Sequence, residues 1–328
     1  GVQTCALPIF AEDVVEKVGY QAGEILFDAL IHQQSPDIAQ GVQNSMESRK
    51  QHVAGEEWKM GAGDQGVMTG YACSETKQFL PLPVVLAHRI VRELSACRIS
   101  EYIRGLLPDG KAQITVEYED GKPVRLDTVI VSCQHAEEKS QKDLEREIRQ
   151  KVLRLALRLL PPDEDTRILI NPSGKFVVGG LDADTGLTGR KLMVDCYGSI
   201  APHGGGAFSG KDATKVDRSG AYMARYIAKN MVAAGLAEKC LVSLAYAIGV
   251  AEPVMVQVDT FGTGTVCADD CLAAAIPLVF GLTPKQIIDH FKLQRPIYSQ
   301  TAVFGHFGRK EFPWERTDKV EALRSALL

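Results

Sequence analysis

The sequence predicts an α+β fold made of repeated domains, and two observations carry this prediction. The order strand, helix, two strands, helix, strand can be traced twice, at about residues 64–180 and 190–300. Between the two copies, residues 179–189 are rich in Gly, Asp and Thr, as expected of a domain boundary. The length of 328 residues also fits about two domains. Recurrence of a whole unit indicates duplicated domains that mix helices and strands.

The composition is that of a globular protein with a core. Hydrophobic residues make up 45% of the chain and the formal net charge is −4, which argues against a nucleic-acid binder. The longest apolar run, around 271–282, contains Pro277 and is shorter than the ~20 residues of a membrane span, so we expect no membrane partner. The eight cysteines contain no Cys-x-x-Cys pair, which favours reduced thiols in a cytoplasmic protein over a zinc site.

In the first half of the chain, the expected elements follow from apolar spacing and turn residues. Residues 11–18 have the pattern of a helix end and residues 25–33 that of a strand. Residues 34–60 are polar, and we interpret them as a long loop that acts as a lid. Asp120-Gly121 marks a hairpin turn. The other elements expected here are strands at 66–72, 113–118, 124–133, 167–170 and 176–180 and helices at 84–99 and 140–160.

In the second half, the pattern starts again with a strand at 191–197. A helix at 212–234 follows and ends at Gly235. The later elements are strands at 241–250 and 254–260 and helices at 268–280 and 284–291.

The strongest local motif is Gly204–Lys211, between the strand and the helix just described. Its glycines let the backbone approach a ligand closely, and a helix start adds partial positive charge to the full charge of Lys211. These features suit a polyphosphate; the alternative is a structural turn before a solvated basic helix. The spacing is close to that of a P-loop, but Asp212 stands where that loop needs a hydroxyl, so we reject that interpretation.

Three weaker signals each leave two alternatives open. Asp212 and Asp217 either form surface ion pairs with neighbouring bases or hold magnesium beside a phosphate. Gly61–Gly66 is either a plain strand entry or a turn that approaches a ligand closely. Phe176, beside Lys175, either stacks on a purine or belongs to the core. The seven histidines show no metal-ligand spacing.

Together these segments resemble, in the right order, the motifs of the S-adenosylmethionine synthetase family, also called methionine adenosyltransferases. The resemblance runs from about residue 11 to the C-terminus. The matching segments are GAGDQGVMTGY (61–71) and GGGAFSGKD (204–212), the two diagnostic motifs, with QSPDIAQGV (34–42), NPSGKFVVGG (171–180), GLTGRK (186–191), KVDRSGAYMARYIAKN (215–230), GHFGR (305–309) and FPWE (312–315).

The resemblance implies a fold of three intertwined domains, a pseudo-threefold repeat of β-α-β-β-α-β units. We accordingly expect an N-terminal remnant with the gating loop at 1–45, a central domain at 60–178, a C-terminal domain at 179–317 and a tail at 318–328. The family opens with a His-Pro-Asp-Lys motif that this chain does not contain. We therefore expect an incomplete first domain that lacks a catalytic histidine and one magnesium aspartate, and a chain that is inactive on its own.

The resemblance also implies a reaction. The methionine sulfur attacks C5′ of ATP and displaces triphosphate, which water then cleaves to pyrophosphate and phosphate. The implied cofactors are two Mg²⁺ per site and K⁺, and the implied assembly is a homodimer or a dimer of dimers with the active site at the interface. The alternative is a non-catalytic nucleotide-binding or assembly subunit, because the N-terminal catalytic segment is missing.

Site residues carry over from the family motifs position by position. Phe176 matches the aromatic residue that stacks on adenine, Asp109 the ribose side and Asp217 a magnesium ligand. Lys175 stands where many relatives have Arg. A lysine keeps the positive charge but cannot form the paired hydrogen bonds of a planar guanidinium. The resemblance places Asp109, Lys111, Ser173, Lys175, Phe176, Asp184, Arg190, Lys191, Ala207 and Lys211 at ATP, and Gln34, Asp64, Asp184 and Lys215 at methionine.

Overall fold

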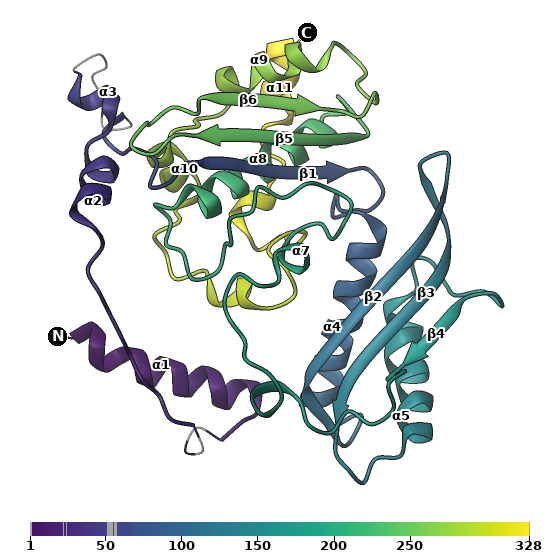
Figure 1. Cartoon of the computed structure of the whole chain (residues 1–328). Coiled ribbons are helices and arrows are strands. Elements are labelled where there is room, and N and C mark those ends of the chain that lie inside the picture. Colours follow the sequence, from purple (N-terminus) through teal and green to yellow (C-terminus); the bar gives the residue numbers. More distant parts are fainter. Residues whose placement is uncertain (1, 22, 24, 51–54, 56–57, 328) are drawn as a thin grey trace. The chain divides into compact units, whose positions relative to one another are not determined.

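The structure, a computed structural model, describes all residues except 1, 22, 24, 51–54, 56–57 and 328. The chain forms two compact units (Figure 1). Helices and strands are mixed in each of them, which confirms the α+β class expected from the sequence. Unit 1 contains residues 1–35, 89–118 and 124–185, and unit 2 contains residues 36–88, 119–123 and 186–328.

Unit 1 is built on a three-stranded sheet in the order β2-β3-β4. β2 (Leu106–Glu119) and β3 (Lys122–His135) are joined at Asp120-Gly121, where both residues have positive φ, 49° and 75°, as a tight hairpin requires. β4 (Arg167–Ile170) runs parallel to β3. The helices of the unit are α1 (Val2–Val18), the second half of α4 (Leu82–Ile99), α5 (Gln141–Glu147) and α6 (Arg154–Ala156).

The helix expected at 140–160 is present, with one irregularity. Ser140 begins it by accepting a hydrogen bond from the backbone N–H of Asp143, and its apolar face is buried at Leu144, Ile148 and Val152. A π-helical stretch, Ile148–Leu153, separates α5 from α6.

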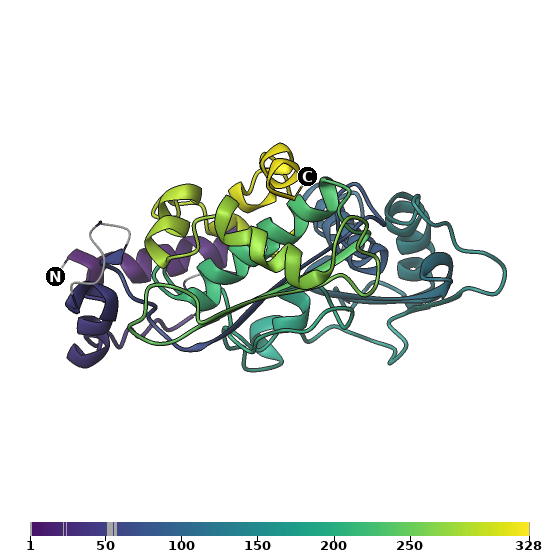
Figure 2. The ribbon, with the colours of Figure 1, turned by 90° about the horizontal axis from the view of Figure 1, so that it is seen from above.

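Unit 2 is built on an antiparallel sheet in the order β1-β5-β6. α8 (Val216–Ala233) packs against one face of this sheet and is buried along most of its length. Figure 2 shows the helices α9 (Asp269–Val279), α10 (Pro284–Phe291) and α11 (Val320–Leu327) on that same side. The strands are β1 (Gly66–Cys73), β5 (Lys239–Tyr246) and β6 (Met255–Asp259), and the further helices are α2 (Pro36–Gln43), α3 (Met46–Arg49) and α7 (Leu192–Asp195).

A buried group of charges joins α8 to the C-terminal part of unit 2. Arg225 donates two hydrogen bonds of 3.0 Å to the carboxylate of Glu315, and Lys229 donates a third of 2.7 Å. The side chains of Arg225 and Glu315 have no exposed surface. Glu315 also accepts a hydrogen bond from the backbone N–H of Gly308. The cluster therefore fixes residues 308–315 on α8.

Several expected elements are wrong. Residues 25–33 and 176–180 contain no strand, and the expected loop at 34–60 contains α2 and α3. Residues 191–197 form the short helix α7 instead of a strand, so the second copy of the repeat lacks its first strand in the described chain. Short apolar runs of this kind fit either structure, and tertiary packing decides.

No single helix of the described chain is both long enough and apolar enough to cross a membrane. α9 and α10 reach that length and composition only when taken as a pair, and the two are bent by 70° relative to each other.

Candidate functional site

The glycine-rich loop 204–211 lies between β1 and the first turn of α8 in unit 2. A Cβ at Gly204 would overlap the backbone carbonyl of Val67, and a Cβ at Gly206 would overlap the carboxylate of Asp217. The loop backbone can therefore pass this close to the strand and the carboxylate only because these positions have no side chain.

Lys211, at the end of this loop, forms an ion pair with Asp217 of α8. The Nζ of Lys211 lies 2.5 Å from Oδ2 of Asp217, and the two side chains are 31% and 15% exposed. Asp217 lies in the first turn of α8, where the helix dipole favours a negative charge. The pair puts a cation and a carboxylate at one partly sheltered position, which suits a phosphate and its counter-ion.

The expected helix start at residue 212 is wrong. α8 begins at Val216, and Lys215 occupies the N-cap position, so Lys211 lies in the loop before the helix. Asp212 and Thr214 form a turn there, in which Asp212 accepts hydrogen bonds from Thr214 and from Lys215. Burial alone would raise the pKa of Asp212, but these hydrogen bonds and the charge of Lys215 outweigh it and lower the pKa.

Arg218, one of the bases near Asp212 and Asp217, anchors the loop. Its side chain is 4% exposed and donates to the backbone carbonyl of Lys211 at 2.7 Å. It also donates to Tyr222 at 3.0 Å and to Thr301 at 2.9 Å, and its guanidinium lies 4.0 Å from the centre of the Tyr298 ring. A basic residue within the apolar pattern of a helix is the signal that could have identified it.

A second anchor is His306, which is fully buried. Its Nδ1 lies 2.7 Å from the hydroxyl of Tyr222, and its Nε2 lies 3.3 Å from the hydroxyl of Ser209 in the loop. Burial, followed by the charges of Arg218 and Arg309, lowers the pKa of His306 to about 3. The imidazole is therefore neutral near pH 7, and its contacts are structural.

His203, directly before the glycines, holds the loop from its other end. Its Nδ1 accepts a hydrogen bond of 2.7 Å from the backbone N–H of Gly205. Burial lowers the pKa of His203, against an opposing effect of Asp217. This places an uncharged imidazole beside the loop at neutral pH.

Other expected residues of unit 2 lie near the same loop. A Cβ at Gly189 would lie 2.8 Å from the Cβ of Ala207, so the chain that leads into Arg190 and Lys191, both exposed, runs against the loop. A Cβ at Gly63 would lie 3.6 Å from the side chain of Lys215. The turn that carries Asp64, which is exposed, therefore lies beside Lys215.

The segment expected to be a lid is attached to unit 2 at defined points. A Cβ at Gly61 would lie 2.5 Å from the carbonyl oxygen of Gly41 in α2 and 2.7 Å from the carbonyl carbon of Gly249. Glu47 in α3 accepts a hydrogen bond of 3.0 Å from the backbone N–H of Ala251. These contacts hold α2 and α3 beside the loop that follows β5, and a lid function stays a prediction.

In unit 1, the structure brings Asp109 and Phe176 to one region. Asp109 of β2 accepts a hydrogen bond of 3.0 Å from the backbone N–H of Gly180. Gln134 of β3 accepts from the backbone N–H of Asp109 at 3.3 Å and donates to the carbonyl of Val177 at 3.0 Å. Gln134 could not be identified from the sequence, because an amide inside a strand pattern carries no sequence signal. Lys111 is exposed two residues after Asp109, on the same face of β2.

Phe176 is half-buried, and both of its backbone groups bind His135 of β3. Its carbonyl accepts a hydrogen bond of 2.9 Å from the backbone N–H of His135, and its N–H donates one of 3.2 Å to Nε2 of the His135 side chain. A Cβ at Gly179 would lie 2.8 Å from the edge of the Phe176 ring, so the ring lies over that glycine. This geometry leaves both interpretations of Phe176, stacking on a purine and packing in the fold, compatible with its position.

Ser173 and Lys175 are exposed on the turn before Phe176. Lys175 is 74% exposed, with its Nζ 3.8 Å from Glu137. Asn171 is buried, and its side-chain amide binds the backbone of Cys133 as a neighbouring strand would: it accepts from the N–H and donates to the carbonyl. It too could not be identified from the sequence. The turn is thus anchored at its start while its tip is solvated.

Two expected residues remain apart from these groups. Gln34 and Asp184 are exposed, and in the described chain neither hydrogen-bonds to another expected site residue. The described residues also contain no group of three or more His, Cys, Asp or Glu side chains placed to hold a metal ion.

Comparison with known proteins agrees with the motifs. Residues 59–176 match the family model of the S-adenosylmethionine synthetase central domain, and residues 178–316 match that of its C-terminal domain. The chain is 52% identical over 326 residues to an S-adenosylmethionine synthase of Streptococcus suis (strain 05ZYH33), which covers 96% of this chain and 82% of that relative. The chain belongs to the S-adenosylmethionine synthetase family.

Proposed function

We propose that this protein is a methionine adenosyltransferase that converts ATP, L-methionine and water to S-adenosylmethionine, pyrophosphate and phosphate. The Lys211–Asp217 pair beneath the glycine-rich loop is the observation that carries the proposal, together with the family membership. In this reaction the methionine sulfur displaces triphosphate from C5′ of ATP, and negative charge accumulates on the leaving group. Cations fixed in advance at the leaving group lower the barrier of such a step.

In unit 2, Lys211, Arg190 and Lys191 would bind the triphosphate, and Ala207 would contribute its backbone in the loop. Asp217 supplies one carboxylate, and Mg²⁺ in proteins is commonly held by one or two carboxylates together with phosphate oxygens. Asp217 therefore fits a magnesium ion that also binds ATP. A Mg²⁺ ion held by Asp217 would supply neutralisation of the negative charge on the phosphates. The family generally uses two Mg²⁺ and K⁺, and we propose the same requirement here.

The remaining roles follow from the family positions. Phe176 would stack on adenine, Asp109 would bind the ribose, and Lys111, Ser173 and Lys175 would lie on the ATP side. Gln34, Asp64, Asp184 and Lys215 would orient methionine.

We further propose the family's assembly and domain plan. The protein would act as a homodimer or a dimer of dimers with active sites at the interface, with domain boundaries at 60–178 and 179–317 and a pseudo-threefold domain repeat. A cytoplasmic location is consistent with the free thiols at Cys73, Cys97, Cys133, Cys196, Cys240, Cys267 and Cys271.

We propose that residues 1–328 alone form little product, because Asp217 is the one position of this sequence that the family motifs assign to magnesium. The test is an assay of purified residues 1–328 with ATP, methionine, Mg²⁺ and K⁺, beside a version joined to the N-terminal region of a relative. Product from the joined version alone supports the proposal, and equal product from both would refute the proposed inactivity. ATP binding without product in either version would favour the non-catalytic alternative.

A further inference from the structure

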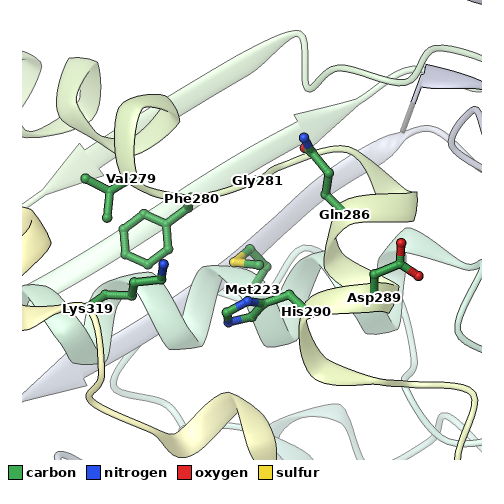
Figure 3. Close-up of a pocket in the computed structure, with 8 residues that line it drawn as sticks. All are labelled: Met223, Val279, Phe280, Gly281, Gln286, Asp289, His290 and Lys319. Carbon is green, nitrogen blue, oxygen red and sulfur yellow. The ribbon is translucent and has the colours of Figure 1, made fainter. Parts of the chain in front are cut away.

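A cavity of about 280 Å³ lies in unit 2 among α8, α10 and the turns before α10 and α11 (Figure 3). It shares no residue with the candidate active site. The close-up shows the ring of Phe280, the amine of Lys319 and the imidazole of His290 on one side, and Asp289 on the other. Apolar walls with a few polar groups are typical of a site for a small organic ligand.

The charges around the cavity leave one cation uncompensated. Lys319 lines it, and its Nζ has no hydrogen-bond or ion-pair partner in the described chain. The carboxylate of Asp289 is already paired with Lys285, at 2.5 Å. The carboxylate of Asp318 accepts a hydrogen bond from Tyr226 and lies 3.8 Å from Arg316. The cavity therefore favours an anion over a cation.

His290 supplies an available polar atom to the same cavity. Its Nε2 is buried without a hydrogen-bond partner among the described residues, and its ring centre lies 5.2 Å from that of Tyr226. Burial, together with Arg316 and Lys319, lowers the pKa of His290, against an opposing effect of Asp318. The neutral imidazole can place a proton on Nε2 and donate it to an acceptor. A buried polar group without a partner costs free energy that a ligand can recover.

We propose that this cavity binds a small carboxylate with a compact apolar body. The carboxylate would pair with Lys319 and accept a hydrogen bond from Nε2 of His290, and the apolar body would lie against Met223, Val279 and Phe280. A charge-assisted pair beside an apolar wall is the arrangement that selects an organic acid over both inorganic anions and neutral molecules. A ligand of about the size of benzoate suits this space.

The test is a titration of the intact protein with benzoate, followed through the methyl resonance of Met223, which Met223→Leu assigns. Benzamide has the same shape without the charge, and inorganic phosphate has the charge without the apolar body. We expect saturable binding of benzoate and much weaker binding of the other two. Lys319→Gln should weaken benzoate binding by at least about tenfold, Lys319→Arg should retain it, and Lys310→Gln, at an exposed lysine outside the cavity, should change nothing.

Three results would overturn the proposal. They are benzamide binding as tightly as benzoate, Lys319→Gln leaving the affinity unchanged, and a Met223 resonance that stays in place under millimolar benzoate. Because the readout is binding rather than product formation, failure here is independent of the proposed catalytic function.

Discussion

The two segments that carry most of the expected site residues are held in opposite ways. Loop 204–211 of unit 2 is fixed by buried side chains, since Arg218 binds the carbonyl of Lys211 and His306 contacts Ser209. Segment 171–180 of unit 1 is anchored near its two ends, while Lys175 on its turn is solvated. We infer that the proposed phosphate side is rigid before a substrate binds, whereas the proposed nucleoside side can adjust. Rigidity is most useful where charge develops in the transition state.

The largest expected effect comes from breaking the support of the rigid side. Glu315→Ala leaves Arg225 and Lys229 without their carboxylate partner inside unit 2. Removing one member of a buried ion pair typically costs about 3–5 kcal/mol. We expect a loss of this size in the free energy of unfolding, measured by urea denaturation.

The matched control is Glu117→Gln in unit 1. Glu117 forms a salt bridge with Arg125 at the surface, at 3.0 Å, where water already solvates both groups. This variant should unfold at nearly the wild-type urea concentration. If the two variants were equally destabilised, burial would not explain the role of Glu315.

The next effect concerns catalysis on the rigid side. Lys211→Ala removes the loop cation that would stabilise the leaving triphosphate. Losing one such contact typically costs about 2–4 kcal/mol of transition-state stabilisation, or roughly 30- to 1000-fold in kcat. KM for methionine should change much less. Steady-state kinetics of Lys211→Ala and wild type, both in the version joined to the N-terminal region of a relative, tests this prediction. Unchanged product formation would show that Lys211 lies away from the phosphates.

A region can be predicted from the sequence when its signal is local, and much less well when tertiary packing decides its structure. The glycine-rich loop, β1, α4 and the Asp120-Gly121 hairpin were predicted correctly because glycine spacing, apolar period and turn residues act locally. The strand expected at 191–197 is wrong, because a seven-residue segment of apolar residues interrupted by Lys191 and Asp195 does not define its own structure. Met193 and Val194 are exposed within the short helix α7, whereas Cys196 and Tyr197, directly after it, are buried.

The supporting residues of the site could not be predicted from local pattern. Arg218 hydrogen-bonds to Thr301, His306 to Tyr222 and Arg225 to Glu315, and each of these pairs is more than eighty residues apart in the chain. Their burial depends on how α8 packs against the C-terminal segment, and a basic residue in a helix is ordinarily exposed. Identifying the loop was possible from sequence, but identifying what holds it required the structure.

A steric change in the loop tests its close contact with Asp217. Gly206→Ala would force the new methyl into the carboxylate of Asp217. Overpacking of this kind typically costs about 1–3 kcal/mol, and here it should also lower kcat by displacing Asp217. Gly186→Ala is the control, since a Cβ there meets open space. Thermal unfolding of both variants, and their kinetics in the version joined to the N-terminal region of a relative, check this. A fully active Gly206→Ala protein would contradict the described packing.

The buried anchor His306 predicts a dependence of stability on pH. Its pKa is about 3 in the folded protein against a usual 6.5, so below pH 6.5 the unfolded chain binds a proton that the folded protein does not. The stability contribution is therefore complete above pH 6.5 and is lost as the pH falls toward 3, by about 1.4 kcal/mol per unit. Unfolding free energies at pH 7.5 and 5.5 should differ by less in His306→Gln than in the wild type. Equal differences would show that His306 protonates normally in the folded state.

The smallest effect is expected on the adjustable side, at Gln134. Its amide joins β2 to residue 177 through two hydrogen bonds, of 3.3 and 3.0 Å. Gln134→Met keeps the volume but removes both bonds, each of which contributes about 0.5–1.5 kcal/mol. Asp109 and Phe176 would then hold their relative positions less firmly. In the version joined to the N-terminal region of a relative, we therefore expect KM for ATP to rise by a few-fold while kcat stays close to wild type. A fall in kcat with unchanged KM would mean that unit 1 also acts in the chemical step, and the contrast between a rigid and an adjustable side would not hold.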